Sequence, residues 1–155
     1  EERLHRASRA EMISCSRCGC LTRFTRYNDA QKVLFDSKRG RCGEYSMCAL
    51  AIFESLGYKA RWIVDWADHL WVEVLVAGKW VHCDPCEASV NEPLLYQGWG
   101  KNQTYIIAFG RDHIEDVTGA YTSDLAAARN RRDDSDSAIQ LAIKEVQVEL
   151  FGTSI

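Results

Sequence analysis

The sequence lacks the features that mark membrane, secreted and nucleic-acid-binding proteins. It has no run of about 18 apolar residues that could span a bilayer, and its first residues, EERLHRASRAEM, contain no apolar core of a signal peptide. Basic residues are not in excess, because 19 Lys and Arg face 22 Asp and Glu and the formal net charge is −3. We therefore expect a soluble intracellular protein with no membrane span and no nucleic-acid partner.

The chain also lacks an initiating methionine and any internal repeat. The missing methionine suggests that the chain begins inside a longer protein. Its 155 residues suit one domain, and a hydrophobic content of 46% is enough to bury a core. The patterns divide the chain into a weakly helical N-terminal remnant at residues 1–14, a core at 15–122 and a C-terminal helical segment at 123–155.

The seven cysteines are an odd number, and without a secretion signal they favour metal binding or catalysis over disulfides. Cys15 and Cys18, on a tight turn with Gly19, could supply two of the four ligands of a zinc site. No second pair of this kind is evident, because the C-x-x-C spacing of Cys83 and Cys86 encloses Asp84-Pro85 after a predicted strand. A half zinc knuckle at 15–20 and a plain reduced turn both remain open.

Cys42 follows a charged, glycine-containing entrance to a predicted helix. The positive end of the helix dipole and two nearby arginines, Arg39 and Arg41, would favour the thiolate. Cys42 is therefore a candidate nucleophile, although a small buried residue would have the same pattern. Apolar residues then recur at spacings of three and four, as one face of a helix requires, until Gly57: Tyr45, Cys48, Ala49, Ile52, Phe53 and Leu56.

A hairpin is predicted at residues 68–84, where two alternating strands flank Ala77-Gly78. If Val76 pairs with Lys79, His69 lies diagonal to Asp84 on one face. The pair could be an ordinary cross-strand contact or the base and orienting carboxylate of a thiol nucleophile. The other face is expected to be the core: Leu70, Val72, Val74, Val76, Val81 and Cys83.

Five segments form a combination that is more specific than any one motif. They are TRFTRYND at 22–29, GRCGEY at 40–45, DWADHLWVE at 65–73, HCDPCE at 82–87, and PLLY with GWGK at 93–101. In this order they resemble the cytoplasmic peptide:N-glycanases, which are amidases with a transglutaminase-like core.

The resemblance implies an α+β, transglutaminase-like (papain-like) core in which a nucleophile helix packs on an antiparallel sheet. It further implies that Cys42 is the nucleophile, His69 the base and Asp84 its orienter, and that Cys15 and Cys18 bind a structural zinc. The other two zinc ligands would come from an upstream part of the core that this chain lacks. Substrate contacts are expected from Trp71, Glu87, Tyr96 and Trp99, although Tyr96 and Trp99 could instead cover the core.

The implied activity is hydrolysis of the amide bond between N-acetylglucosamine and asparagine in misfolded, high-mannose N-glycoproteins during endoplasmic-reticulum-associated degradation. A ubiquitin-receptor protein that shuttles to the proteasome and an AAA ATPase are implied partners, with a cytoplasmic and also nuclear location. Two alternatives remain, because a Cys-His-Asp triad specifies the type of reaction and not the substrate. One is a transglutaminase or cysteine protease, and the other is a catalytically silent binding module of the DNA-repair type.

Overall fold

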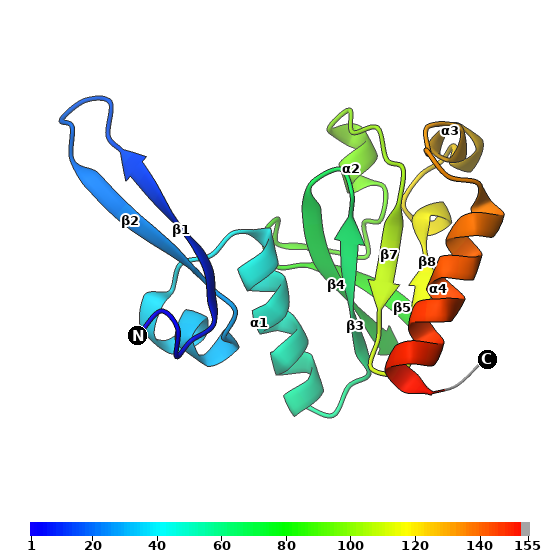
Figure 1. Ribbon diagram of the computed structural model, residues 1–155, viewed down its shortest axis with the longest axis horizontal. Helices are drawn as coiled ribbons and strands as arrows, with labels where there is room; N and C mark the ends of the chain where they lie inside the picture. The colour runs from blue at the N-terminus through cyan, green and yellow to red at the C-terminus, as the bar shows by residue number, and fades with distance from the viewer. Residues whose placement is uncertain (153–155) are drawn as a thin grey trace.

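The protein has an α+β fold in which a six-stranded antiparallel sheet carries helices on both faces (Figure 1). We describe a computed structural model that covers residues 1–152. The strand order is β6-β5-β4-β3-β7-β8. The bounds are β3 Ala60–Asp65, β4 His69–Val76, β5 Lys79–Asp84, β6 Ser89–Val90, β7 Ile106–Phe109 and β8 Ile114–Asp116.

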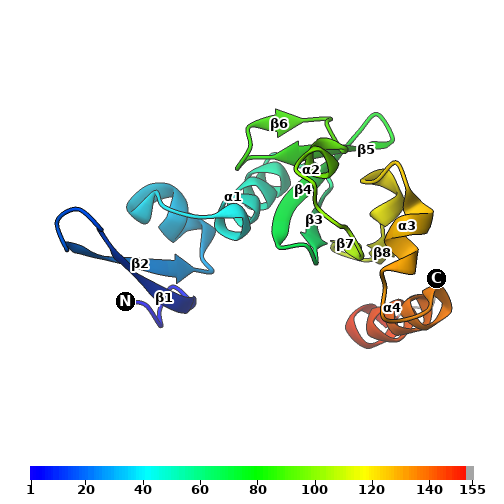
Figure 2. The same ribbon diagram turned by 90° about the horizontal axis from the view of Figure 1, so that it is seen from above.

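A separate two-stranded hairpin precedes the sheet and corrects the expectation of a helical remnant at residues 1–14. Ala7–Ser14 form β1, which pairs antiparallel with β2, Leu21–Tyr27. The weak helical pattern is overridden because pairing with β2 satisfies the backbone groups of β1 and brings Glu11 beside Arg26, 3.0 Å away. The hairpin projects away from the large sheet and lies next to α1 (Figures 1 and 2).

The predicted helix after Gly40 is confirmed as α1, Cys42–Ser55. It follows a short π-helical segment, η1, at Lys32–Ser37. Its buried positions, however, are Glu44, Ser46 and Cys48, whereas Ile52 and Leu56 of the expected apolar face are 43% and 67% exposed. Partners elsewhere in the fold explain this difference, because the Ser46 hydroxyl donates to the Leu70 carbonyl and Glu44 binds Arg26.

The β4–β5 hairpin has the predicted register. Val76 pairs with Lys79 and Glu73 pairs with His82, so paired numbers sum to 155. The turn requires positive φ at both central residues, and Ala77 and Gly78 have φ of 49° and 79°. The alternation of the two strands was therefore sufficient to place His69 and Asp84 on the same face.

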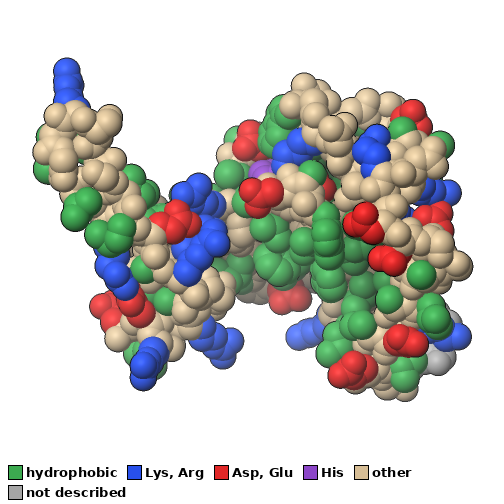
Figure 3. Space-filling view, turned by 45° about the horizontal axis from the view of Figure 1, so that its top comes forward, with side chains coloured by type: hydrophobic (Ala, Val, Ile, Leu, Met, Phe, Trp, Pro, Cys, Tyr) green, Lys and Arg blue, Asp and Glu red, His purple; other side chains and the backbone are tan. Residues whose placement is uncertain are grey.

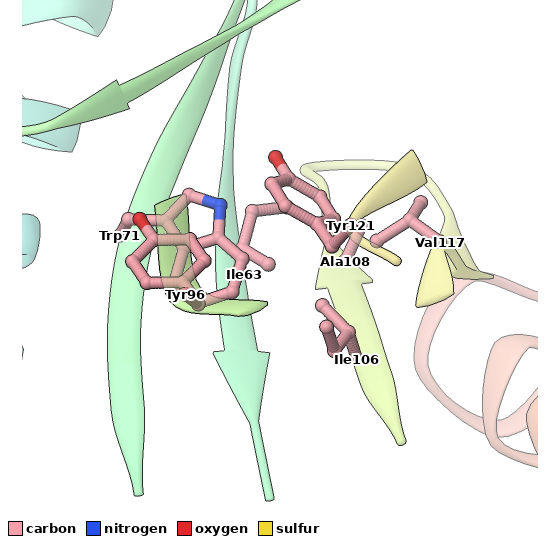
Figure 4. Close-up of a cluster of buried hydrophobic side chains, with 7 residues drawn as sticks. All are labelled: Ile63, Trp71, Tyr96, Ile106, Ala108, Val117 and Tyr121. Atoms are coloured by element: carbon pink, nitrogen blue, oxygen red, sulfur yellow. The ribbon is translucent and has the colours of Figure 1, made fainter. Parts of the chain in front are cut away.

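The expected location of the core is wrong in one respect, because both faces of the sheet are buried. Helix α1 covers the face of Leu70 and Val72, as expected. The opposite face, which carries His69 and Asp84, holds an aromatic cluster in which Trp71 and Tyr96 stack with centroids 4.3 Å apart (Figure 4). Tyr96 comes from α2, Leu95–Gly98, and Tyr121 follows the 3-10 turn η2, Thr118–Ala120. The remaining members of the cluster are Ile63, Ile106, Ala108 and Val117.

The helical segment predicted at 123–155 forms helices within its described residues, 123–152, and residues 153–155 lie outside the described part. Asp124 caps α3, Leu125–Asn130, and Ser135 caps α4, Asp136–Phe151. Helix α4 lies beside β8 and borders a groove of about 620 Å³ whose walls include Ile107, Phe109 and Ile143. Hydrophobic side chains form a band there on the surface (Figure 3). Within residues 1–152, no helix has both the length and the apolar character needed to cross a membrane.

Candidate active site

Cys42 is the first residue of α1, and its half-buried thiol faces His69 of β4. The pKa of Cys42 is lowered from its ordinary value, mainly by a hydrogen bond with His69 and further by the Gly43 and Leu70 backbone, against the effect of burial. Arg41, which was expected to favour the thiolate, instead binds Glu11 at 2.6 Å. The imidazole, rather than an arginine, is therefore the main partner of the thiol.

His69 and Asp84 form the cross-strand pair that the hairpin register predicts. The Nε2 atom of His69 lies 2.7 Å from Oδ2 of Asp84, and both side chains are buried. Burial alone would lower the pKa of His69, but hydrogen bonds with Asp84 and Cys42 raise it to about 9. With Nε2 directed at Asp84, Nδ1 is the ring nitrogen left to face Cys42. The arrangement can hold a thiolate–imidazolium pair.

The turn after β5 anchors the carboxylate of Asp84. The backbone N–H groups of Cys86 and Glu87 donate to Oδ1 at 2.8 and 3.2 Å. Burial would raise the pKa of Asp84, but hydrogen bonds from His69 and Tyr96 lower it below its usual value. The HCDPCE segment therefore serves to orient a charged carboxylate, which is why its C-x-x-C spacing does not indicate a metal site.

The four predicted substrate-binding residues occupy different environments. Trp71 and Tyr96 are fully buried in the aromatic cluster, which corrects the expectation that they contact substrate, because neither ring has a free surface for a sugar. Trp99 is 44% exposed, and its ring centroid lies 5.4 Å from that of His69. Glu87 is exposed beside Asp84. Trp99 and Glu87 thus lie at the mouth of the site.

Several residues support the site in roles that the sequence did not predict. Tyr96 donates its hydroxyl hydrogen to Oδ2 of Asp84 at 2.9 Å. The Nε2 atom of His82 lies 2.6 Å from the hydroxyl oxygen of Tyr96. Lys101 donates to the Ala67 carbonyl at 2.5 Å, which braces the turn before His69. The alternation of β5 places His82 on the same face as Asp84, but only the fold brings α2 against that face.

A buried ion pair joins the β1–β2 hairpin to the start of α1. Arg26 binds Glu44 in a bidentate manner, with N–O distances of 2.5 and 2.7 Å, and Glu44 also accepts from the Arg41 backbone N–H at 2.9 Å. Gly40 allows this close packing, since a Cβ there would lie 2.7 Å from Glu44 Cβ. The ion pair therefore fixes the first turn of α1, where Cys42 lies.

Cys15, Cys18 and Cys20 lie exposed at the tip of the β1–β2 hairpin. The pKa of Cys18 is lowered by hydrogen bonds from Cys20 and Cys15, so the three residues are close together. Within residues 1–152, however, no three His, Cys, Asp or Glu side chains are placed to hold a metal ion. Cys15 and Cys18 suit half of a tetrahedral zinc site, and the described residues do not complete it.

We expect Cys42 to react with iodoacetamide at least about tenfold faster than Cys86 at pH 6–7, because the thiolate is the reacting form. Because the pKa of Cys42 is lowered from its ordinary value of 9.0, its thiolate forms at a lower pH than an ordinary thiolate. The His69 imidazolium persists until about pH 9. The ion pair therefore exists between the lowered pKa of Cys42 and about pH 9. Cys86 is exposed as a residue, but partial desolvation of its thiol and the nearby charges of Asp84 and Glu87 raise the pKa of that thiol. Peptide mapping after timed alkylation measures both rates, and equal labelling of the two cysteines would contradict an activated Cys42.

The chain is similar to a protein family and to several named proteins. The model of the transglutaminase-like superfamily matches residues 1–85. The chain is 46% identical over 119 residues to a Gallus gallus protein named peptide-N(4)-(N-acetyl-beta-glucosaminyl)asparagine amidase, which covers 75% of this chain and 18% of the relative. Relatives of the same name from Oryza sativa subsp. japonica and Yarrowia lipolytica are 45% and 42% identical over 72% and 78% of this chain.

The chain spans 18% of the length of the Gallus gallus relative, 26% of the Oryza sativa relative and 35% of the Yarrowia lipolytica relative. The family match ends one residue after Asp84, so it includes Cys42, His69 and Asp84. Since this match covers more than half of its residues, the chain belongs to the transglutaminase-like superfamily.

Proposed function

We propose that this chain carries the active site of a deglycosylating amidase that hydrolyses the amide bond between N-acetylglucosamine and asparagine in misfolded N-glycoproteins. The observation that carries the proposal is the alignment of Cys42, His69 and Asp84 across α1, β4 and β5, in a chain similar to proteins named as this amidase. A thiolate beside an imidazolium is suited to attack on an amide carbonyl.

In the first half-reaction, the Cys42 sulfur attacks the carbonyl carbon of the asparagine side chain. The S–C bond forms, the C–N bond breaks, and the proton on Nδ1 of His69 passes to the departing nitrogen, which leaves as a glycosylamine. The oxyanion formed during attack requires N–H donors, and the backbone N–H of Cys42 at the start of α1 is one candidate.

In the second half-reaction, water hydrolyses the thioester. His69 accepts a proton from the water as the oxygen bonds to the acyl carbon, and the Cys42 thiolate leaves. The peptide product carries aspartate in place of asparagine. Asp84 holds the His69 ring in one orientation through both steps, because its Oδ1 is fixed by two backbone N–H groups.

Burial of the triad supports an unfolded glycoprotein as substrate. His69 and Asp84 are buried and Cys42 is half-buried, so the asparagine side chain must approach closely, which a folded protein surface would hinder. Trp99 offers an exposed aromatic surface beside His69, where a sugar ring could stack. We assign substrate contact to Trp99 and Glu87 and none to Trp71 or Tyr96.

The family resemblance adds a cellular setting to the proposal. It comprises high-mannose substrates in endoplasmic-reticulum-associated degradation, a cytoplasmic and also nuclear location, and two partners: a ubiquitin receptor that shuttles to the proteasome and an AAA ATPase. Cys15 and Cys18 would hold a structural zinc together with two ligands from outside the described residues. No step of the proposed reaction uses that metal.

The test is incubation of the chain with a denatured high-mannose glycopeptide, followed by mass spectrometry of the peptide. We expect loss of the glycan with conversion of asparagine to aspartate. Cleavage of a peptide bond, or transfer of the acyl group to an added primary amine, would instead identify a protease or a transglutaminase. An unchanged peptide, also with a longer protein that contains this chain, would contradict the amidase proposal.

A further inference from the structure

A line of buried polar groups lies behind Asp84, on the side away from Cys42. It runs from the Glu92 backbone through His82 and Tyr96 to Asp84, with successive distances of 3.3, 2.6 and 2.9 Å. His82, Tyr96 and Asp84 are 3%, 0% and 1% exposed. Bulk solvent does not reach these side chains, so their polar atoms must form hydrogen bonds with one another.

The hydrogen bonds of this line can run in one direction. The Glu92 N–H donates to Nδ1 of His82, which makes Nδ1 an acceptor and leaves the hydrogen of the neutral ring on Nε2. Burial lowers the pKa of His82, so the ring is neutral. His82 Nε2–H therefore donates to the oxygen of Tyr96, and the hydroxyl hydrogen of Tyr96 is free for Asp84.

This direction determines the protonation of the candidate triad. Oδ2 of Asp84 lies 2.9 Å from the Tyr96 hydroxyl and 2.7 Å from Nε2 of His69. Oδ1 accepts from two backbone N–H groups as well, so both oxygens act as acceptors, which favours the ionised carboxylate. His69 consequently carries its hydrogen on Nε2, and Nδ1 is free to take the proton of Cys42.

We infer that Tyr96 and His82 are positioning residues of the Cys42–His69–Asp84 triad, which direct Oδ2 of Asp84 toward His69 and hold it as a carboxylate. The inference rests on the proposed function only insofar as that triad performs catalysis. The Tyr96 ring packs against the His69 ring, with centroids 5.1 Å apart, but the hydrogen bonds of its hydroxyl group go to Asp84 and His82. The hydrogen bond of His82 reaches the triad through Tyr96. Their effect passes through Asp84.

Other titratable groups lie around Asp84 and must be considered in any pH profile. His69 approaches from β4 and Tyr96 from α2, while His82 is on the same strand as Asp84. Besides His69, the neighbouring groups whose own pKa values respond to the charge of Asp84 are Tyr96, His82, Cys83 and Cys86. Among them, Tyr96 is the one whose side chain donates a hydrogen bond to the carboxylate.

Tyr96→Phe tests the inference, because it removes the hydroxyl and keeps the stacked ring. Tyr121→Phe is the matched control, since Tyr121 is equally buried in the same cluster but donates to Glu73 at 2.6 Å. Loss of a donor raises the pKa of a carboxylate. The acid limb is the low-pH part of the pH profile of Cys42 alkylation, where the rate falls as the pH falls. We expect it to move to higher pH by about half a unit or more in Tyr96→Phe and to stay in place in Tyr121→Phe.

Amidase kinetics give a second measurement on the same variants. We expect Tyr96→Phe to lower kcat about tenfold or more with little change in KM, because the lost hydrogen bond supports a charged group and not the substrate. His82→Gln, which retains an N–H donor for Tyr96, should remain closer to the native protein than His82→Leu. Thermal unfolding of each variant identifies effects that arise only from lost stability.

The two kinds of measurement separate this inference from the proposed function. Alkylation of Cys42 needs no glycan turnover, so a shifted acid limb would support the positioning role even if the glycopeptide test contradicted the amidase. Identical alkylation profiles in Tyr96→Phe and Tyr121→Phe would overturn the positioning role, whatever the substrate. Equal profiles for His82→Gln and His82→Leu, both shifted, would exclude a directional hydrogen bond from His82.

Discussion

Replacing Cys42 with alanine is expected to abolish glycan release, with a loss in kcat/KM on the order of 10⁴-fold or more. The variant removes the atom that forms the thioester, and His69 and Asp84 retain no nucleophile to activate. The residual rate would reflect substrate binding and N–H donors alone. Mass spectrometry of a denatured glycopeptide, with the asparagine-to-aspartate conversion as readout, measures the loss directly.

Cys86→Ala is the matched control for this prediction. Cys86 is an exposed cysteine near the same carboxylate, and its contribution to Asp84 is a backbone N–H that alanine retains. We expect this variant to keep activity within about twofold, because no side-chain contact with the triad is lost. Full activity in Cys42→Ala, or an equal loss in both variants, would show that the reaction does not depend on a Cys42 thioester.

Replacing Arg26 with alanine is expected to destabilise the fold by roughly 3–5 kcal/mol, because it leaves the buried carboxylate of Glu44 without its ionic partner. The side chains of Arg26 and Glu44 are 11% and 6% exposed, so solvent cannot compensate for the loss. The pair also joins the β1–β2 hairpin to the first turn of α1, and Cys42 reactivity should fall as well. Urea unfolding at neutral pH gives the change in the free energy of unfolding.

The effect of Arg26→Ala should depend on pH in a defined direction. Burial would raise the pKa of Glu44, but bonds from Arg26 and the Arg41 backbone lower it below its ordinary value of 4.5. The stability that ionised Glu44 contributes is therefore present above pH 4.5 and is lost as the pH falls through the lowered pKa. The difference between native and Arg26→Ala proteins should shrink over that acidic range.

Two controls make this prediction specific. Arg23, also in β2, forms an ion pair with Glu2, but both side chains are about half exposed, so Arg23→Ala should destabilise the fold much less than Arg26→Ala. The double variant Arg26→Ala/Glu44→Gln removes the stranded charge and should recover part of the loss of Arg26→Ala. Strictly additive effects of the two substitutions would contradict a direct coupling between Arg26 and Glu44.

The sequence was sufficient for the parts of the site that local patterns control. The glycine turn and alternation of 69–84 determine the β4–β5 register, and the register places His69 near Asp84 because side chains repeat with a period of two. The helix beginning at Cys42 follows from apolar spacing and its glycine-containing entrance. These features depend on neighbours in the chain, so they can be read before the fold is known.

Other features depended on contacts between segments distant in sequence. β1 is a strand because β2 pairs with it, and Glu44 is buried because Arg26, 18 residues earlier, neutralises it. Tyr96 supports Asp84 instead of binding sugar, because α2 packs onto a sheet face whose polar residues suggested exposure. Sequence alone thus determined the helix that begins at Cys42 and the His–Asp pairing, whereas tertiary packing decided which polar groups are buried, since each needs a partner from another element.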